Sequence, residues 1–263
     1  MNYELNDKIV VIAGGTTGIG EAVAYAMAEQ GAKVVVCGRN AETIEKMNRK
    51  ISNLGHDITV VKADVSKISE IKKLAETAVN TYGTIDVWIN NACAGGIGPF
   101  NKLSEETFDE VINANFKSYW YGTAIASDIM KSQGKKGIII NTASFNAHMP
   151  SGGKALYSAT KAAILNMTKV FAVELAKFEI RVVSISPGYT ITRITKDEAE
   201  KNYDRLSLAI PSKRFATVDD MSAAYLFLAS DVSNYINGVD IRVDGGKFAT
   251  QDPQWSWTYE GEL

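Results

Sequence analysis

Residues 8–20 read KIVVIAGGTTGIG. The apolar, β-branched part of this stretch predicts a strand over residues 8–13 that is buried on both faces. Glycines at positions 14, 18 and 20 then allow a tight turn into a helix, predicted over residues 19–30. Such a turn lets the backbone approach a pyrophosphate, which would bind at the N–H groups and positive dipole end of the helix. Because the glycines follow a strand and open a helix, the stretch predicts a dinucleotide-binding loop.

The rest of the chain repeats this alternation of strand and helix. Further β-branched runs predict strands over residues 33–37, 58–62, 87–90, 137–141, 181–186 and 240–243. Amphipathic segments between them predict helices over residues 41–54, 68–82, 104–131, 155–178 and 218–229. Parallel strands need helical crossovers, so the pattern predicts an α/β protein with a doubly wound seven-stranded parallel sheet and helices on both faces. We expect this Rossmann fold to form a single domain over residues 1–263.

Composition narrows the function classes. The chain has 263 residues, of which 46% are hydrophobic and 22% charged, and a net charge of -2. That charge gives no basic surface for nucleic acid or an anionic membrane, and no apolar run reaches the length of a membrane span. Cys37 and Cys93 lack the number or spacing for a disulfide framework or a metal site. With a polar N-terminus and no signal peptide expected, the sequence predicts a cytoplasmic protein.

The end of the second strand carries the residues that discriminate between cofactors. NAD sites usually place an acidic residue there, whereas a nearby arginine can accept the 2′-phosphate of NADP. Here Gly38 stands where the acid would be expected and Arg39 follows it. The sequence therefore favours NADP, with NAD as the alternative if Arg39 is an ordinary turn residue. After the third strand, Asp64 could accept from the adenine amino group or cap the next helix.

Tyr157 and Lys161 lie at the start of the helix predicted over residues 155–178. Their spacing places them on one helical face, one turn apart. A tyrosine, with a pKa near 10, is a poor general base at neutral pH, and a cation beside it favours the phenolate. The pair is therefore a candidate acid/base group with Lys161 as the cation, and an ordinary surface pair is the alternative.

Taken together and in order, the motifs resemble the short-chain dehydrogenase/reductase family over residues 8–246. The resemblance rests on the glycine loop at 14–20, Asp64-Val65, Asn90-Asn91-Ala92, Asn115, Ser144, Tyr157 to Lys161, Pro187-Gly188 and Val243-Asp244-Gly245-Gly246. It implies an NAD(P)-dependent oxidoreductase that interconverts a secondary alcohol and a ketone. It also implies that Tyr157 exchanges a proton with the substrate oxygen, while Lys161 lowers the pKa of Tyr157 and binds the nicotinamide ribose.

The same resemblance assigns the other site residues. Ser144 would polarise the substrate oxygen, and Asn115, rather than the nearby Asn113, would complete a water-linked relay to Lys161. The Thr190 backbone would meet the nicotinamide carboxamide and Thr192 the pyrophosphate. The cofactor would be bound by Gly14, Thr16, Thr17, Gly18, Ile19, Gly20, Arg39, Asn40, Asp64, Val65, Asn91, Ala92, Tyr157, Lys161, Pro187, Gly188, Thr190 and Thr192. The substrate would meet Ser144, Asn146, Tyr157 and Tyr189.

Two of the departures from the family pattern bear on the predictions. Cys93 replaces the glycine of the usual Asn-Asn-Ala-Gly, and we expect it to be a buried structural cysteine rather than a nucleophile. Thr17 stands where many NADP-using relatives carry a basic residue, which weakens the prediction of NADP.

The residues expected to line the pocket indicate which class of substrate fits. Residues 190–215 suit a lid that closes over the substrate, with an ordinary surface helix as the alternative. The predicted wall, from residues 95–100 and 145–152, Tyr189 and this lid, has no paired arginines to bind a phosphate or carboxylate. Within it, His148 is expected to be an incidental surface residue. A neutral ring alcohol such as a hydroxysteroid fits best, and a 3-oxoacyl thioester and a sugar or polyol are the alternatives.

Aromatic residues at two places point to subunit contacts. Trp255, Trp257 and Tyr259 in the tail at 248–263 are costly to expose, so we expect them to pack on the chain's own core or on another subunit. The Tyr-Trp-Tyr run at 119–121 lies on a helix that contributes to a dimer face in the family, with core packing as the alternative. By resemblance we expect a homotetramer.

Two function classes remain, an enzyme and a non-catalytic dinucleotide sensor on the same fold. A sensor has no need of the tyrosine, its lysine, the polarising serine and the asparagine, and all four are present. The sequence therefore favours the enzyme.

Overall fold

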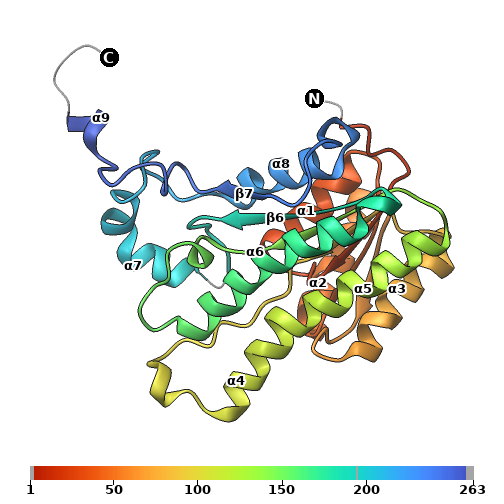
Figure 1. Ribbon diagram of the computed structural model, residues 1–263, viewed down its shortest axis with the longest axis horizontal. Coiled ribbons are helices and arrows are strands. Elements are labelled where there is room, and N and C mark those ends of the chain that lie inside the picture. Colours follow the sequence, from red (N-terminus) through yellow and green to blue (C-terminus); the bar gives the residue numbers. More distant parts are fainter. Residues whose placement is uncertain (1–2, 194, 259–263) are drawn as a thin grey trace.

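Seven parallel strands form one sheet in the computed structural model, which describes residues 3–193 and 195–258 (Figure 1). The strand order is β3-β2-β1-β4-β5-β6-β7. The strands are β1 (Ile9–Ala13), β2 (Lys33–Gly38), β3 (Ile58–Lys62), β4 (Val87–Asn90), β5 (Gly137–Thr142), β6 (Ile180–Pro187) and β7 (Asp240–Val243). The predicted doubly wound sheet is confirmed, and each predicted strand end lies within one residue of the observed end.

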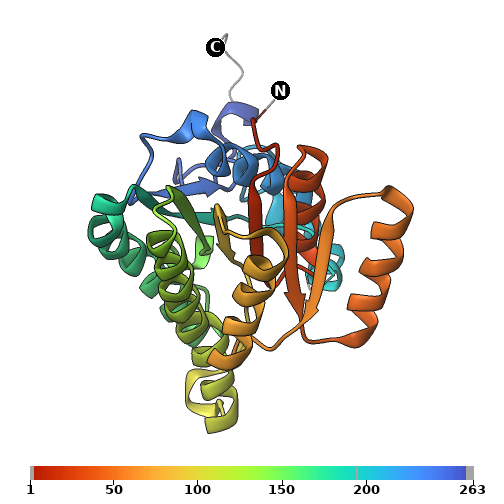
Figure 2. The same ribbon diagram turned by 90° about the vertical axis from the view of Figure 1, so that its right-hand side faces the viewer.

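Helices cover both faces of the sheet (Figure 2). They are α1 (Gly18–Glu29), α2 (Ala41–Leu54), α3 (Ile68–Tyr82), α4 (Glu105–Ile112), α5 (Ser118–Ser132), α6 (Ala155–Leu175), α7 (Lys196–Ser207), α8 (Val218–Ala229) and the short α9 (Trp255–Thr258). Val10 and Ile12 join the apolar core under α1 and α8, whereas Ile9 and Val11 join the core under α3 and α5. Alternate side chains of a strand point to opposite faces, so β1 is buried on both sides, as predicted. Within the described residues, no helix is long and apolar enough to cross a bilayer.

The strand order reverses between β1 and β4, which opens a crevice at the carboxyl edge of the sheet. Ala13 is in register with Cys37 of β2 and with Asn90 of β4, so the loops after these strands leave the sheet at one level. The Asn91 side-chain amide then donates to the Gly14 carbonyl at 2.7 Å. This bond ties the glycine loop to the loop that follows β4.

The single helix predicted over residues 104–131 is interrupted. Between α4 and α5 lies a π-helical turn, Asn113–Lys117, closed by a bond from the Ser118 N–H to the Asn113 carbonyl. The widened turn carries Asn115, whose side chain bonds the backbone of Ala94 in the loop after β4. Turns of this type often occur at functional sites. The helix predicted over residues 155–178 also ends differently, in the 3-10 turn Ala176–Phe178.

The segment predicted as a lid contains α7, so the helix of the alternative interpretation is present. Ala199 of α7 is buried in a small apolar cluster with Ile210 and Phe215, and Tyr189 packs against this cluster. The segment is therefore anchored at several points, and its closure over a substrate stays a prediction. Residue 194 of the predicted lid lies outside the described residues.

The C-terminal tail contacts the chain without burying its aromatic rings. The Trp257 Nε1–H donates to the Pro211 carbonyl at 2.9 Å, and the Lys213 ammonium lies 4.1 Å from the Trp257 ring centroid. Trp255 and Trp257 nevertheless remain 52% and 56% exposed. Packing of these rings on another subunit therefore stays a prediction, and Tyr259 lies outside the described residues.

The Tyr-Trp-Tyr run on α5 divides between core and surface. Tyr119 is buried, whereas Trp120 and Tyr121 remain 46% and 37% exposed. Core packing, the alternative interpretation, accounts for Tyr119 alone. Because Trp120 and Tyr121 are exposed, a dimer face at this helix stays a prediction.

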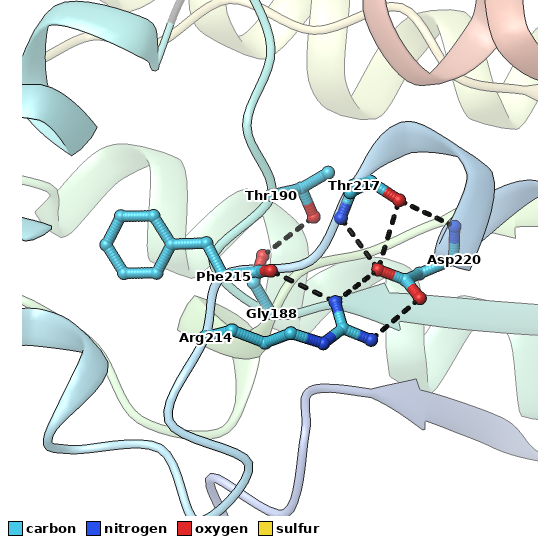
Figure 3. Close-up of polar contacts among 6 residues, drawn as sticks. All are labelled: Gly188, Thr190, Arg214, Phe215, Thr217 and Asp220. Carbon is cyan, nitrogen blue, oxygen red and sulfur yellow. Dashed lines mark hydrogen bonds and ion pairs between the residues drawn. The ribbon is translucent and has the colours of Figure 1, made fainter.

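An ion pair combined with a capping box fixes the chain before α8 (Figure 3). Both terminal nitrogens of Arg214 donate to Asp220, at 2.6 and 3.0 Å, and Asp220 also accepts from the Thr217 N–H at 2.7 Å. The Thr217 hydroxyl oxygen accepts in return from the Asp220 N–H, which completes the box. Arg214 further donates to the carbonyl of Phe215, a residue that lines the cavity described below. The network thus anchors one wall of that cavity.

We expect Asp220→Ala to lower the free energy of unfolding by about 1–2 kcal/mol at neutral pH, because it removes the acceptor of the box and of the ion pair. Hydrogen bonds from Arg214 and the Thr217 backbone hold the pKa of Asp220 well below its usual range. The stabilisation is therefore present above the unfolded pKa, near 4, and declines as the pH falls towards the folded pKa. Urea unfolding at neutral pH and at roughly pH 3 should show the difference from wild type narrowing.

Asp219→Ala is the matched control, since it removes a carboxylate from the same helical turn. We expect it to change the free energy of unfolding by less than about 0.5 kcal/mol. Equal losses in the two variants, or an Asp220→Ala effect that does not change with pH, would contradict this account of the network.

Candidate active site

A cavity of about 470 Å³ follows the carboxyl edge of the sheet. Its lining comes from the loops after β1 to β6 and from α6 and α7. The sequence-predicted residues in the lining are Gly14, Thr16, Thr17, Gly18, Ile19, Arg39, Asn40, Asp64, Val65, Asn91, Ala92, Ser144, Asn146, Tyr157, Lys161, Pro187, Gly188, Tyr189, Thr190 and Thr192. The structure therefore brings nearly the whole predicted set to one cavity. Gly20 and Asn115, the other two, lie behind its wall.

Gly20 is needed for packing of the glycine loop. A Cβ at this position would overlap the Gly14 carbonyl oxygen and the Asn91 side-chain amide. Those are the two groups joined by the 2.7 Å hydrogen bond between the loops. Gly20 therefore shapes the loop and does not line the cavity.

The end of β2 is shaped by a contact with the glycine loop. A Cβ at Gly38 would overlap the Thr16 hydroxyl, which also accepts a bond from the Thr43 hydroxyl at 3.3 Å. An acidic side chain at position 38 therefore has no room unless Thr16 moves. Arg39 lines the cavity and is 3.6 Å from the Glu110 carboxylate, with both side chains about half exposed.

Two further residues at the cofactor end use their side chains locally. The Asn40 side-chain oxygen accepts from the N–H groups of Glu42 and Thr43 and caps α2. One carboxylate oxygen of Asp64 accepts from the Ser66 N–H at 3.0 Å, in a turn that precedes α3. Lys67, not Asp64, is the N-cap residue of α3, so the capping interpretation is wrong. Asp64 lines the cavity, and its contact with the adenine stays a prediction.

Lys161 is a fully buried cation with neutral partners. Its Nζ donates to the Thr142 carbonyl at 2.6 Å and to the Tyr119 hydroxyl at 3.2 Å. Burial disfavours the charged form and lowers the pKa of Lys161 to about 8. The lysine thus titrates close to the neutral range.

Tyr157 lies beside Ser144, and the two side chains share a hydrogen bond. Burial raises the pKa of Tyr157 well above its usual value and outweighs that bond. Lys161 is not among the causes of this shift, since its ammonium bonds Thr142 and Tyr119 and lies 5.7 Å from the Tyr157 ring centroid. The lowering that the family resemblance implies therefore stays a prediction. With its pKa raised, the hydroxyl keeps its proton at neutral pH.

Asn115 fixes the loop that carries Cys93. Its side-chain oxygen accepts from the Ala94 N–H at 2.7 Å, and its nitrogen donates to the Ala94 carbonyl at 2.9 Å and to the Thr160 hydroxyl at 3.2 Å. The side chain thus joins the loop after β4 to α6, close to Lys161 in the sequence. Its part in a water-linked relay stays a prediction.

The end of the cavity beyond Ser144 is walled by aromatic rings. The ring centroids of Phe145 and Tyr189 are 4.7 Å apart. Tyr189 in turn stacks on Phe215, with 5.5 Å between the ring centroids. Asn146 is held there by a bond from the Ser151 hydroxyl to its side-chain oxygen at 2.9 Å. A flat, apolar substrate face would find complementary surface in this region.

The sequence analysis missed two basic residues in the lining, Lys154 and Arg193. Each stands next to a predicted feature, Lys154 just before the helix at residue 155 and Arg193 just after Thr192. Their positions beside these predicted features were the signal in the sequence that could have identified them as lining residues. The wall is therefore more basic than the sequence interpretation allowed.

Cys93 was expected to be buried, and that prediction is wrong. The residue is exposed and lines the cavity, in the loop after β4. His148, expected to be an incidental surface residue, bonds Asp240 at 2.9 Å through Nε2 and is not part of the lining. Within the described residues, no group of three histidine, cysteine or acidic side chains could hold a metal ion.

Comparison with known proteins gives one consistent answer. A family model described as short chain dehydrogenase matches residues 8–203. The L-rhamnose-1-dehydrogenase of Scheffersomyces stipitis is 34% identical, over 93% of this chain and 97% of the relative. The 3beta-hydroxysteroid dehydrogenase 2 of Eggerthella lenta is 31% identical, over 93% and 96%. Among solved structures, a short-chain type dehydrogenase/reductase from Mycobacterium marinum is 32% identical, covers 95% of this chain and 98% of that chain, and has a TM-score of 0.88.

We expect Asn115→Ala to lower the free energy of unfolding by about 2 kcal/mol, because it leaves the partly buried N–H and carbonyl of Ala94 without their partner. Asn113→Ala, in the same π-helical turn, is the control and should cost less than about 1 kcal/mol. Urea denaturation of both variants measures the difference. Equal costs would show that the bonds of Asn115 to Ala94 do not stabilise the turn.

Proposed function

The chain belongs to the short-chain dehydrogenase/reductase family, and from that premise we propose that it interconverts a secondary alcohol and a ketone by hydride transfer. NADP(H) is the preferred cofactor of the proposal, and NAD(H) is the second. The observation that carries it is the meeting of Tyr157, Ser144 and Lys161 in the cavity that the glycine loop also lines. A non-catalytic sensor would not need these three groups together.

The cavity suits a dinucleotide at the start of α1. Thr17, the N-cap residue of α1, makes no side-chain capping bond, and Gly18 and Ile19 of the first turn line the cavity. Uncapped N–H groups at a helix N-terminus bind phosphate well. Gly14, Gly18 and Ile19 would therefore hold the pyrophosphate, and Thr192 would close the other side.

The protein contributes position and a proton. The cofactor supplies or accepts the hydride when it is bound. The Ser144 hydroxyl would hydrogen-bond the substrate oxygen, and the Tyr157 hydroxyl would donate its proton to that oxygen. Burial raises the pKa of Tyr157, so at neutral pH the hydroxyl holds the proton that ketone reduction requires. Lys161 would bind the nicotinamide ribose and place a positive charge behind the reacting oxygen.

The preference for NADP follows from the end of β2. Thr16 closes the space in which an acidic side chain at position 38 would reach a ribose diol. Arg39 lines the cavity, and its half-exposed ion pair with Glu110 is weak enough to be exchanged for a phosphate. These two observations support the arginine as the 2′-phosphate ligand.

A ring-borne secondary alcohol of the hydroxysteroid type is the substrate that we propose. The aromatic rings of Phe145, Tyr189 and Phe215 support it, since they offer an apolar wall beyond Ser144. A sugar or polyol is the second candidate, because Lys154 and Arg193 add charged donors to the lining. A 3-oxoacyl thioester is the third. A panel of a ketosteroid, a keto sugar and an acetoacetyl thioester distinguishes the three.

We further propose that the chain is one domain and assembles as a homotetramer. Two sets of exposed aromatic side chains support contacts between subunits. Trp120 and Tyr121 lie on α5, and Trp255 and Trp257 lie in the tail. Exposed aromatic side chains that lie together are typical of interaction sites.

We expect Tyr157→Phe to reduce ketone turnover about 10²- to 10⁴-fold, the usual contribution of a general acid. NADPH affinity, followed by quenching of intrinsic fluorescence, should stay within about twofold of wild type, because the ring is retained. Tyr235→Phe, which alters a fully exposed tyrosine, is the control and should keep full turnover. Turnover at the wild-type rate in Tyr157→Phe would contradict the role of Tyr157 as the acid, whereas wild-type protein that binds NADPH without any turnover would favour the sensor.

We expect Arg39→Ala to lower kcat/KM for NADPH about 10- to 100-fold and to leave kcat/KM for NADH within about twofold, because only NADPH loses a charge-assisted hydrogen bond. Arg49→Ala is the control, since Arg49 is an exposed arginine of α2 that pairs with Glu45. Equal losses with the two cofactors would show that Arg39 does not bind the 2′-phosphate. The oxidoreductase assignment would remain.

A further inference from the structure

We propose that Tyr119 is a positioning residue for Lys161, and that its hydroxyl keeps the buried lysine charged and aimed at the reaction centre. The inference rests on the role of Lys161 in the proposed function. It assigns a chemical task to a tyrosine that the family resemblance placed only on a dimer face or in the core.

The geometry joins Tyr119 to the lysine in two ways. The Lys161 Nζ donates to the Tyr119 hydroxyl oxygen at 3.2 Å and also lies 4.9 Å from the Tyr119 ring centroid. The Tyr119 hydroxyl donates its own proton to the Thr142 carbonyl at 3.1 Å, the same carbonyl that accepts from Lys161 at 2.6 Å. The three groups form a closed triangle, so the tyrosine oxygen presents a lone pair to the ammonium.

The tyrosine is held rigidly in this position. Its side chain is 1% exposed and packs with Ala143, Ile164 and Met167. The side-chain amide of Asn90 also approaches the Tyr119 backbone carbonyl, at 3.5 Å. Because the Tyr119 ring is fixed, it determines the position of the Lys161 ammonium.

Lys161 needs such a partner because it is buried without a carboxylate. Within the described part of the chain, the titratable groups that face it are Cys93 from the loop after β4, Tyr119 from α5 and Tyr157 from α6, and Tyr225 of α8 lies on the far side of Thr142. Burial raises the pKa of Tyr119 and of Tyr157, so neither is an anion near neutral pH. Burial lowers the pKa of Lys161 to about 8. The Tyr119 hydroxyl, its ring face and the Thr142 carbonyl contact the ammonium and favour its charged form.

A role in packing alone would require only the ring. Phenylalanine keeps the ring and the apolar contacts, so Tyr119→Phe isolates the hydroxyl. Loss of a hydrogen bond to a charged group should lower the pKa of Lys161 by about one unit. The alkaline limb of kcat/KM for ketone reduction should therefore move about one pH unit lower, with little change at more acidic pH.

Tyr225→Phe is the matched control. It removes another buried tyrosine hydroxyl that bonds Thr142, at 2.6 Å to the side-chain oxygen, but it leaves the bonds of Lys161 intact. We expect this variant to lose a similar amount of stability and to keep the wild-type pH profile. If both variants shift the profile equally, or neither does, Tyr119 has only a packing role and the proposal fails.

A second measurement does not depend on turnover. The pKa of Lys161 can be followed by NMR in protein labelled with ¹³Cε-lysine, with the signal assigned by its absence from Lys161→Met. We expect the Lys161 signal to titrate about one pH unit lower in Tyr119→Phe than in wild type or Tyr225→Phe. An unchanged titration overturns the inference, whereas inactive wild-type protein with a shifted titration overturns the proposed function alone. If Tyr119→Phe does not fold, 3-fluorotyrosine at position 119, a weaker acceptor, should give a smaller shift in the same direction.

Discussion

A buried ammonium group with neutral partners is the interaction on which the rest of the site depends. The Lys161 side chain is buried from solvent. Its charge is tolerated because Thr142 and Tyr119 present their oxygens to the ammonium group. These partners belong to β5 and α5, and the lysine belongs to α6. The bonds of this side chain therefore join α6 to both β5 and α5. A helix that must satisfy this cation also places Tyr157, one turn away, against Ser144.

The parallel sheet explains why these groups meet the glycine loop. Each strand from β1 to β6 delivers its following loop to the same edge, and the reversal of order between β1 and β4 leaves that edge open. The loops after β1 and β2 present backbone amides and Arg39, whereas those after β4 to β6 present the reacting side chains. Bonds between the loops, such as Asn91 to the Gly14 carbonyl, hold the two halves together. The residues that would bind the cofactor and the residues that would react thus line one cavity.

The sequence predicted this arrangement where local patterns decide the outcome. Buried β-branched runs and glycine turns identified all seven strands, and the order of motifs placed nearly every candidate residue in the cavity. Prediction failed where a long-range contact overrides the local pattern. The π-helical turn follows from bonds of Asn115 to Ala94, which periodicity within residues 104–131 cannot reveal. The exposure of Cys93 depends on the path of a loop, and the direction of the Tyr157 pKa depends on burial, so neither can be read from neighbours in the sequence.

The central claim is that this cavity carries out hydride transfer, with the protein giving the proton to the substrate oxygen. The most direct test is to incubate the purified protein with NADPH deuterated at the transferable position and a ring ketone, and to analyse the alcohol by mass spectrometry. The account predicts one deuterium at the carbinol carbon of each product molecule, while the hydroxyl proton comes from solvent by way of Tyr157. Tight binding of NADPH with no deuterium transferred to any carbonyl of the panel would contradict it, and would leave a dinucleotide-binding protein without this chemistry.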